Sequence, residues 1–421
     1  MRKYDFPFAH TLVMRWRAER AFALTFCALF VVGFGNSMLL AVLPPIARAI
    51  SLPDRFVGAV FSVSALLWVL TSPYWGRLSD RLGRRPIIAL GLWAFAVSMG
   101  LFTLVAAGGL ARYYGPIACF LGMASARAVF GAIGSATSPA AQAYIADTSP
   151  PHLRLRQLGA LTSAFALGSV IGPAFCAALA ARFGLISPLA FTTGLAILAG
   201  LALNFLLPKA PPPERDAQDT PLQASSSAWR LARDPRVRSY LVFGAGISLA
   251  VGVLAQTFAF YTMDKLNVSG SAGAARSAAG FSAGAISLLI VQLLVLPRIR
   301  LDNRKLMVLG AGLAALSVVV QISAHDLIGL MASQALQGMG FGLARPGFST
   351  GASLAVKPYE QGALAGLVVA ANGAGFVISP LAGNALYEVA GMNAPLVLCI
   401  AVLAGLALFA FTDRALRRAN P

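Results

Sequence analysis

The sequence predicts an all-α membrane protein: twelve transmembrane helices arranged as two pseudo-symmetric bundles of six. Three observations support this prediction. Apolar residues make up 58% of the 421 residues and charged residues only 11%, and the mean hydropathy is +0.74, outside the range of soluble domains. Apolar runs of about 20 residues, long enough to cross the bilayer core, recur along the chain. Residues of the first half also recur at a fixed offset in the second.

The predicted spans fall into two groups of six, separated by the one long polar segment. This segment is rich in proline and serine, a composition typical of a linker. We therefore expect an N-terminal bundle at 1–207, a cytoplasmic linker at 208–237 and a C-terminal bundle at 238–421. The spans are expected near 21–44, 55–74, 87–107, 116–144, 155–181, 187–207, 238–262, 276–298, 305–324, 327–348, 360–385 and 392–411.

An internal repeat links the bundles at an offset of 207 residues, which brings Arg127 onto Gln334. Paired six-helix halves of this kind place a substrate site between them near the bilayer midplane, and rocking of the halves about it gives alternating access. The aligned residues are Arg127, Gly131, Pro139, Gly168, Gly172 and Pro173 with Gln334, Gly338, Pro346, Gly375, Ser379 and Pro380.

The net charge of +18 is explained by membrane topology. With both termini in the cytoplasm, 25 lysines and arginines lie on the cytoplasmic side and six on the other, which is the positive-inside distribution. These cations are spread over seven short segments, so the distribution argues against nucleic-acid binding. We expect a multi-pass protein of the bacterial inner membrane with cytoplasmic termini.

The sequence offers nothing for catalysis or for cofactor binding. The four cysteines lie in apolar runs without disulfide or zinc spacing, and no phosphate-binding loop, dinucleotide fingerprint, metalloprotease motif or nucleophile elbow occurs. The first apolar run lacks a small-residue cleavage site, so it is expected to remain as a helix. We expect no enzyme activity, no cofactor and no metal.

Residues 76–86, with the sequence GRLSDRLGRRP, form a short cationic turn with one acid and two glycines. This turn resembles the signature loop of the major facilitator superfamily, and its sequence is close to that of the drug:proton antiporters, including the tetracycline exporters. The resemblance implies a charge cluster with Asp147 that latches the outward-facing state. An anchor that serves only membrane orientation remains the alternative. The residues assigned to this latch are Gly76, Asp80, Arg81, Gly83, Arg84, Arg85 and Asp147.

Two further segments share this resemblance. Arg127 lies about ten residues inside its span, where an unpaired cation is costly; the family resemblance implies a role in the cavity and in proton coupling. Snorkelling or a structural hydrogen bond is the alternative. Gly168, Gly172 and Pro173 resemble the antiporter motif of the fifth helix, a hint of export, although Cys176 and Ala177 stand where antiporters usually continue with glycines.

Acids are missing from the middle of every predicted span. Val32 stands where the tetracycline exporters carry their acid in the first helix, with Asn36 the nearest polar residue. We therefore expect a neutral or anionic amphipathic substrate. A coupling proton would have to use Asp147, Asp264 or another peripheral acid, or travel with the substrate.

Polar residues inside the spans are candidates for substrate contact. The resemblance implies that the first, fourth, seventh and tenth helices line the cavity, which favours Asn36, Gln256, Gln334 and Gln337. Asn372 is a further candidate. Each of these amides could instead form a hydrogen bond between helices.

The leading interpretation is a proton-coupled secondary exporter of the multidrug antiporter type, working by alternating access as a monomer in the lipid bilayer. Uptake or exchange of an organic anion, such as a siderophore-like metabolite, fits the arginines and the missing acid almost as well. A membrane scaffold or signalling protein that has kept a transporter fold is a third interpretation; it would tolerate replacement of Asp80 or Arg127.

Overall fold

The computed structural model describes residues 7–149, 151–208, 230–299, 301–357, 360–413 and 416. All regular structure within these ranges is helical, and twelve helical stretches are long and apolar enough to cross a membrane. The first bundle contains α1 (Pro7–Ala49), α2 (Asp54–Leu82), α3 (Arg84–Leu110), α4 (Pro116–Ala132), α5 (Thr137–Thr148), α6 (Pro151–Phe183) and α7 (Ser187–Leu206). The second contains α9 (Pro235–Lys265), α10 (Gly270–Ile290), α11 (Asn303–Ser323), α12 (Leu327–Leu354), α13 (Gln361–Ala390) and α14 (Ala394–Thr412).

The fourth span differs from the single helix expected at 116–144. A turn of 3₁₀ helix at Gly134–Ala136 separates α4 from α5, and it leaves backbone carbonyls of α4 without helical partners. The Trp75 indole of α2 supplies one missing donor, to the Ala132 carbonyl at 2.6 Å. The Thr71 hydroxyl of α2 lies 3.2 Å from the Gly131 carbonyl and 2.8 Å from the Leu67 carbonyl of its own helix. Such compensation is what allows a helix to break at membrane depth.

Close helix contacts repeat in the two bundles at the positions that the repeat relates. A β-carbon on Gly168 of α6 would lie 2.1 Å from the Phe30 carbonyl oxygen of α1. At the equivalent position, a β-carbon on Gly375 of α13 would lie 2.6 Å from the Leu249 backbone nitrogen of α9. Glycine is needed at both positions because the helix backbones touch. The fold is therefore two related helical bundles.

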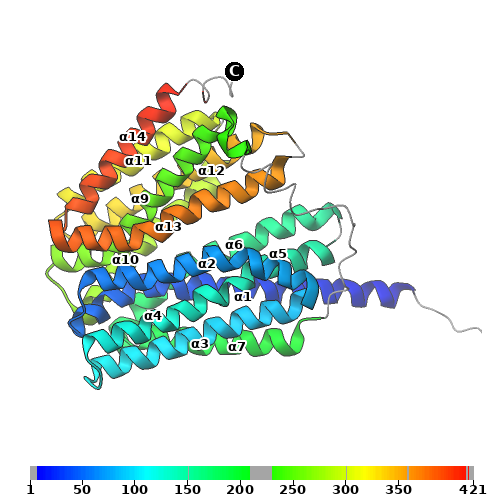
Figure 1. Ribbon diagram of the computed structural model, residues 1–421, viewed down its shortest axis with the longest axis horizontal. Coiled ribbons are helices and arrows are strands. Elements are labelled where there is room, and N and C mark those ends of the chain that lie inside the picture. Colours follow the sequence, from blue (N-terminus) through cyan, green and yellow to red (C-terminus); the bar gives the residue numbers. More distant parts are fainter. Residues whose placement is uncertain are drawn as a thin grey trace, which may run out of the picture.

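The two bundles do not lie parallel to each other (Figure 1). We call the end that carries the Arg77–Arg85 loop between α2 and α3 the basic end. The far end, which carries the α1–α2 and α9–α10 connections, is called the opposite end. In Figure 1 the bundles approach each other at the opposite end and diverge toward the basic end.

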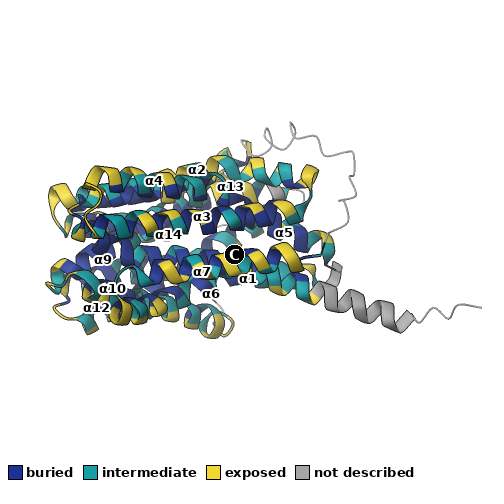
Figure 2. Cartoon of the chain, turned by 90° about the horizontal axis from the view of Figure 1, so that it is seen from below, coloured by how far each residue is buried: buried dark blue, intermediate teal, exposed yellow. Residues whose placement is uncertain are grey.

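Burial follows the pattern expected of a protein surrounded by lipid. Buried residues face the interior of the bundles, and exposed residues lie on the outer surfaces (Figure 2). Many of the outward side chains are large and apolar, such as Leu104, Phe205 and Val389, which are 68%, 73% and 81% exposed. An apolar surface of this extent fits contact with hydrocarbon.

Candidate substrate site

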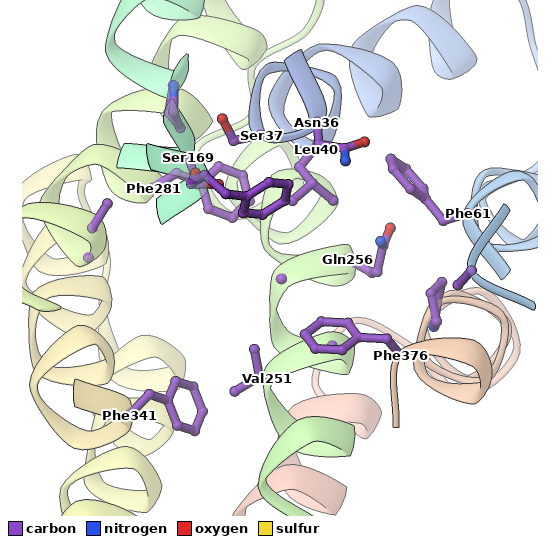
Figure 3. Close-up of a pocket in the computed structure, with 18 of the residues that line it drawn as sticks. Asn36, Ser37, Leu40, Phe61, Ser169, Val251, Gln256, Phe281, Phe341 and Phe376 are labelled. Carbon is purple, nitrogen blue, oxygen red and sulfur yellow. The ribbon is translucent and has the colours of Figure 1, made fainter. Parts of the chain in front are cut away.

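A cavity of about 560 Å³ lies between the two bundles. The first bundle lines it with α1, α2, α4 and α6, and the second with α9, α10, α12 and α13. Figure 3 shows the side chains of Gln256, Phe281 and Phe341 around this space. Aromatic rings make up much of the wall and come from both bundles: Phe61, Trp68, Phe130, Phe165, Phe281, Phe341 and Phe376. We call this space the central cavity.

Arg127 is the charged residue of the central cavity. Its side chain is almost fully buried, and its Nη2 donates to Asn36 Oδ1 at 3.0 Å. The guanidinium carbon lies 4.5 Å from the centroid of the Phe130 ring and 5.7 Å from that of Phe61. Among the described residues, Nε and Nη1 of Arg127 have no hydrogen-bond partner. Two buried charged donors thus have no partner, an arrangement that is costly.

Three glutamines also line the central cavity, and all three come from the second bundle. Gln334 Nε2 donates to Gln337 Oε1 at 3.0 Å, which leaves the Gln337 amide hydrogens and the Gln334 carbonyl oxygen for other partners. Gln256 lies on α9 and points into the space (Figure 3). No aspartate or glutamate is among the described residues that line this cavity, so its electrostatic character is set by one cation and several amides.

The structure separates Asn372 from the other amide candidates. This residue lines a second cavity of about 460 Å³, nearer the basic end, rather than the central cavity. Its Oδ1 accepts a hydrogen bond of 2.7 Å from Ser248 of α9. From the sequence, Asn372 was expected in the same cavity as the other amides. One face of α13 lines both cavities, and the sequence does not indicate which residues of that face belong to which cavity.

The antiporter-like segment of α6 packs against α1 and borders the central cavity. A β-carbon on Gly172 would lie 2.2 Å from the Ser37 hydroxyl and 2.6 Å from the Phe34 carbonyl oxygen. Pro173 and its repeat partner Pro380 both line the cavity. The two prolines thus occupy related positions, one in each bundle.

At the basic end, Arg84 is the centre of a cluster of charged residues. Its guanidinium forms an ion pair with Asp80 and another with Asp147, with Nε to Oδ2 at 3.0 Å. Arg84 also donates to the Ser79 hydroxyl at 2.7 Å, and only 11% of its side chain is exposed. Arg81 points outward and is exposed. Gly83 has φ of 94°, in a region that favours glycine, and it allows the chain to turn between α2 and α3.

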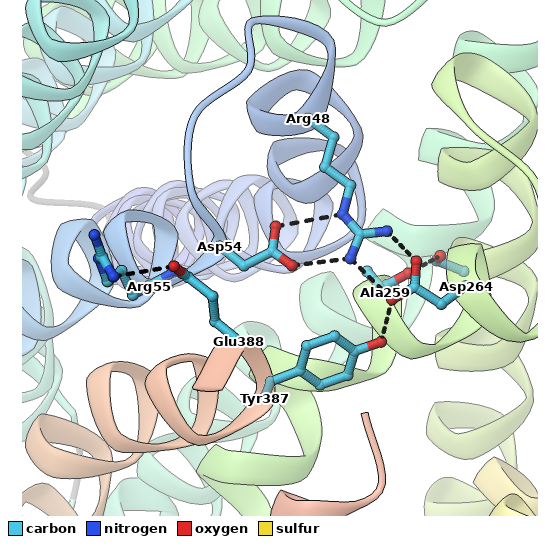
Figure 4. A network of polar contacts seen from close by, with 8 residues as sticks. Arg48, Asp54, Arg55, Ala259, Asp264, Tyr387 and Glu388 are labelled. Carbon is cyan, nitrogen blue, oxygen red and sulfur yellow. Dashed lines mark hydrogen bonds and ion pairs between the residues drawn. The ribbon is translucent and has the colours of Figure 1, made fainter. Parts of the chain in front are cut away.

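At the opposite end, a network of charged residues joins the two bundles (Figure 4). Arg48 of α1 pairs with both oxygens of Asp264 of α9, with Nη2 to Oδ2 at 2.9 Å. Arg48 also donates to Asp54 at 2.8 Å, and the Tyr387 hydroxyl donates to Asp264 at 2.5 Å. We call Arg48, Asp54, Asp264 and Tyr387 the clamp.

A second ion pair lies beside the clamp. Arg55 of α2 lies 3.1 Å from Glu388 of α13, and the Arg55 backbone N–H also donates to this carboxylate at 2.9 Å. Neither ion pair was predicted from the sequence, where Arg48 and Arg55 are two of the six cations expected on the side away from the cytoplasm. The sequence does show acids and arginines at the ends of the spans that form these contacts, but it does not indicate which acid pairs with which arginine.

A family model described as the Major Facilitator Superfamily matches residues 25–300 and 281–421. The chain belongs to the major facilitator superfamily. As a member of it, this facilitator is a membrane transporter of small molecules.

Curated relatives and solved structures agree with this assignment. Quinolone resistance protein NorA of Staphylococcus aureus is 25% identical over 388 residues, which cover 90% of this facilitator and 93% of that protein. Multidrug resistance protein 2 of Bacillus subtilis is 28% identical over 189 residues, or 44% of this chain and 43% of that protein. A bacterial homologue of the human lysosomal transporter Spinster, solved in an inward-facing, unoccupied conformation, shares the fold. Its TM-score is 0.75 at 18% identity, covering 96% of this chain and 98% of that one.

Proposed function

We propose that this facilitator is a proton-coupled exporter of neutral or anionic amphipathic small molecules. The observation that carries the proposal is Arg127, which lines a central cavity walled by aromatic rings and has two buried guanidinium donors without a hydrogen-bond partner among the described residues. An anionic group would satisfy these donors by charge-assisted hydrogen bonds, and the rings would hold the apolar body of the substrate. A cation would be repelled by Arg127 and would find no carboxylate to pair with among the described lining residues.

The size of the cavity and the names of the relatives support export of small molecules. A volume of about 560 Å³ falls within the range of about 300–1,000 Å³ typical of small-molecule sites. The relatives are named for multidrug resistance and quinolone resistance, and export of a toxic small molecule is one way in which a membrane transporter confers resistance. We carry this direction of transport over to the present chain as part of the proposal.

The charge distribution supports an orientation with the basic end in the cytoplasm. In this orientation the structure corresponds to an inward-facing state, closed toward the outside by the clamp and by the Arg55–Glu388 pair. Export then requires these contacts to break as the halves rock about the central cavity. The Arg84–Asp80–Asp147 cluster, which lies entirely within the first bundle, is proposed to serve as the latch of the outward-facing state.

We assign the coupling proton to Asp264. This acid accepts hydrogen bonds from both halves, from Arg48 of the first bundle and from Tyr387 of the second. Protonation of Asp264 would remove the negative charge that holds Arg48, and the outer end would be free to open. When the outer end closes again, Arg48 re-forms its ion pair with Asp264 and the proton leaves. In this scheme proton release toward the cavity accompanies closure.

The test of the proposed function is flux in proteoliposomes with an imposed pH gradient. 1-Anilinonaphthalene-8-sulfonate, an amphipathic anion, should accumulate in the compartment from which protons leave. Asp264→Asn should abolish this gradient-driven accumulation but retain downhill exchange. Accumulation that ignores the gradient in either direction would remove proton coupling from the proposal, and accumulation in the direction of proton flow would reverse the proposed direction of transport.

Uptake or exchange of an organic anion is the second candidate function, and the same feature favours it. Arg127 and the lack of a lining carboxylate select for negative charge whichever way the substrate moves. Exchange without proton coupling would be seen in the same vesicles. Flux of the anionic probe would then require an anion in the opposite compartment and would be unchanged in Asp264→Asn.

A further inference from the structure

The second cavity, of about 460 Å³, holds an arginine without a partner among the residues that the structure describes. Arg345 of α12 is half-buried and lines this space with Gln292, Ser349, Thr350 and Asn372. It makes no hydrogen bond or ion pair with any other described residue. A guanidinium within a transmembrane helix normally finds a counter-charge or a polar partner, so its freedom points to a ligand.

The polar groups around Arg345 include several hydrogen-bond donors. Asn372 uses its Oδ1 to accept from Ser248, so its amide hydrogens remain for other partners. Thr350 contributes a hydroxyl group that can donate to an acceptor, whereas the Ser349 hydroxyl lies 3.4 Å from the Pro346 carbonyl of its own helix and donates to it. No carboxylate is among the described residues that line the cavity. A site rich in donors, with one cation and no acid, is suited to a carboxylate, sulfonate or phosphate group.

The second cavity continues the central cavity along three helices. On α12 the lining residues pass from Gln334 and Gln337 through Phe341 to Arg345, at intervals of three and four residues that keep them on one helix face. On α13, Pro380, Phe376 and Asn372 follow the same spacing, and on α10 the face continues from Leu288 to Gln292 in the adjoining π turn.

Phe376 lines both cavities, so its ring forms a shared wall between them. Arg345 lies eight residues beyond Gln337 toward the basic end, a rise of about 12 Å along the helix. The end of α12 at Leu354 is about 14 Å further on by the same measure. An anion approaching from the basic end would therefore reach Arg345 before it reached Arg127.

We propose that the Arg345 cavity is a separate binding site for the anionic head group of an amphipathic substrate, occupied on the way between the basic end and the central cavity. This inference rests on the proposed function, since it extends the anion preference of Arg127 to a second site on the same route. Arg345 binds the charged group through its guanidinium, with Asn372 as second donor. Phe348 and Phe376 contact the apolar part.

The test is equilibrium binding of two matched dyes to the purified full chain in nanodiscs of zwitterionic lipid. 1-Anilinonaphthalene-8-sulfonate carries one negative charge, and N-phenyl-1-naphthylamine has nearly the same aromatic skeleton without it. Fluorescence titration of the wild type should reveal two saturable sites for the anionic dye. Arg345→Gln should remove one of them or weaken it at least about tenfold, as expected for the loss of charge-assisted hydrogen bonds. Binding of the neutral dye should change less than about twofold.

Two variants guard against an effect of misfolding. Ser349→Glu keeps Arg345 but places a carboxylate one helical turn away, where it can neutralise the guanidinium; it should remove the same site. Arg298→Gln removes a positive charge at the basic end, from a side chain that donates to the Leu294 carbonyl, and should leave both sites intact. Unchanged anionic-dye binding in both Arg345→Gln and Ser349→Glu would overturn the proposal. Equal loss of the neutral dye would also overturn it.

The same titrations separate this inference from the proposed function. If Arg127→Gln removes one anionic site and Arg345→Gln removes none, the proposed function stands and the Arg345 site falls. If Arg345→Gln removes a site and Arg127→Gln has no effect, the Arg345 site stands and the anion preference of the central cavity falls. Phosphatidylglycerol in the nanodisc distinguishes the sources of the head group: competition identifies lipid as an occupant, and unchanged affinity restricts the site to free amphiphiles.

Discussion

Arg48 of α1 binds both carboxylate oxygens of Asp264 of α9 and thereby joins the two halves of the transporter at the opposite end. The two residues are 216 positions apart in the chain. Both side chains are about one-third exposed, at 31% and 35%. The pair lies where the halves must separate if the opposite end is to open, so the strength of the pair determines how readily this end opens.

The first prediction is that breaking this pair favours the open outer end. Arg48→Ala should shift the equilibrium toward opening by about 1–2 kcal/mol, since a charged hydrogen bond that is only partly buried lies between the exposed and buried cases. Spin labels at Tyr113 and Ile328, exposed residues on either half at this end, would report the change as a longer interlabel distance.

The charge reversal of Arg48→Asp with Asp264→Arg provides the matched control. Each single reversal should lengthen the distance, because like charges then face each other, and the double variant should restore most of the short population. If the double variant opens as far as either single variant, the ion pair does not hold this end closed.

The second prediction concerns the proposed latch at the basic end. Arg84→Gln leaves Asp80 and Asp147 without their common cation and should slow transport at least about tenfold, the cost of unpairing charge-assisted hydrogen bonds. Arg81→Gln, on an exposed neighbour, should stay within about twofold of wild type. Initial flux rates in proteoliposomes measure both. Equal effects of the two variants would show that the loop contributes only positive charge.

The third prediction is a packing effect within α6. In Gly168→Ala the new β-carbon would lie 2.1 Å from the Phe30 carbonyl oxygen, so α1 and α6 must move apart, at a cost of about 1–3 kcal/mol. Gly159→Ala in the same helix meets no atom within 4 Å and should be neutral or slightly stabilising. Thermal unfolding in detergent compares them. Equal transition temperatures would argue against the close contact of the two helices.

The fourth prediction changes the charge of the central cavity through Asn36. Its Oδ1 accepts from Arg127 at 3.0 Å, so Asn36→Asp places a carboxylate against the guanidinium with little change of volume. The neutralised site should bind 1-anilinonaphthalene-8-sulfonate at least about tenfold more weakly, while N-phenyl-1-naphthylamine should bind as in the wild type. Asn36→Ser, which alters the contact without adding charge, is the control.

Much of the fold could be predicted from the sequence because one physical requirement sets both hydropathy and helix length. Backbone N–H and C=O groups in the hydrocarbon must be hydrogen-bonded within the protein. The twelve spans and the paired bundles are confirmed. The break between α4 and α5 was not predicted, since the Ala132 carbonyl at the break finds its donor, the Trp75 indole, on another helix. Hydropathy does not report such compensation.

The residues of the candidate site that could be predicted are those whose polar or charged side chains are energetically costly to place in a transmembrane helix. Arg127 and the glutamines drew attention for that reason, and they line one cavity. The clamp could not be read from the chain, because Arg48 and Asp264 each look like ordinary charges at a span end until the halves are placed together. The lack of a partner for Arg345 could not be predicted either, because it depends on which side chains the neighbouring helices place around it.

The most direct test of the account is the charge selectivity of transport by the wild-type chain. Initial rates should be measured in proteoliposomes for 1-anilinonaphthalene-8-sulfonate, N-phenyl-1-naphthylamine and the cation tetraphenylphosphonium, with Arg127→Gln alongside. We predict saturable transport of the anionic and neutral dyes, no saturable transport of the cation, and selective loss of the anionic dye in the variant. Saturable transport of the cation, unaffected by Arg127→Gln, would contradict the central claim that this arginine sets the substrate charge.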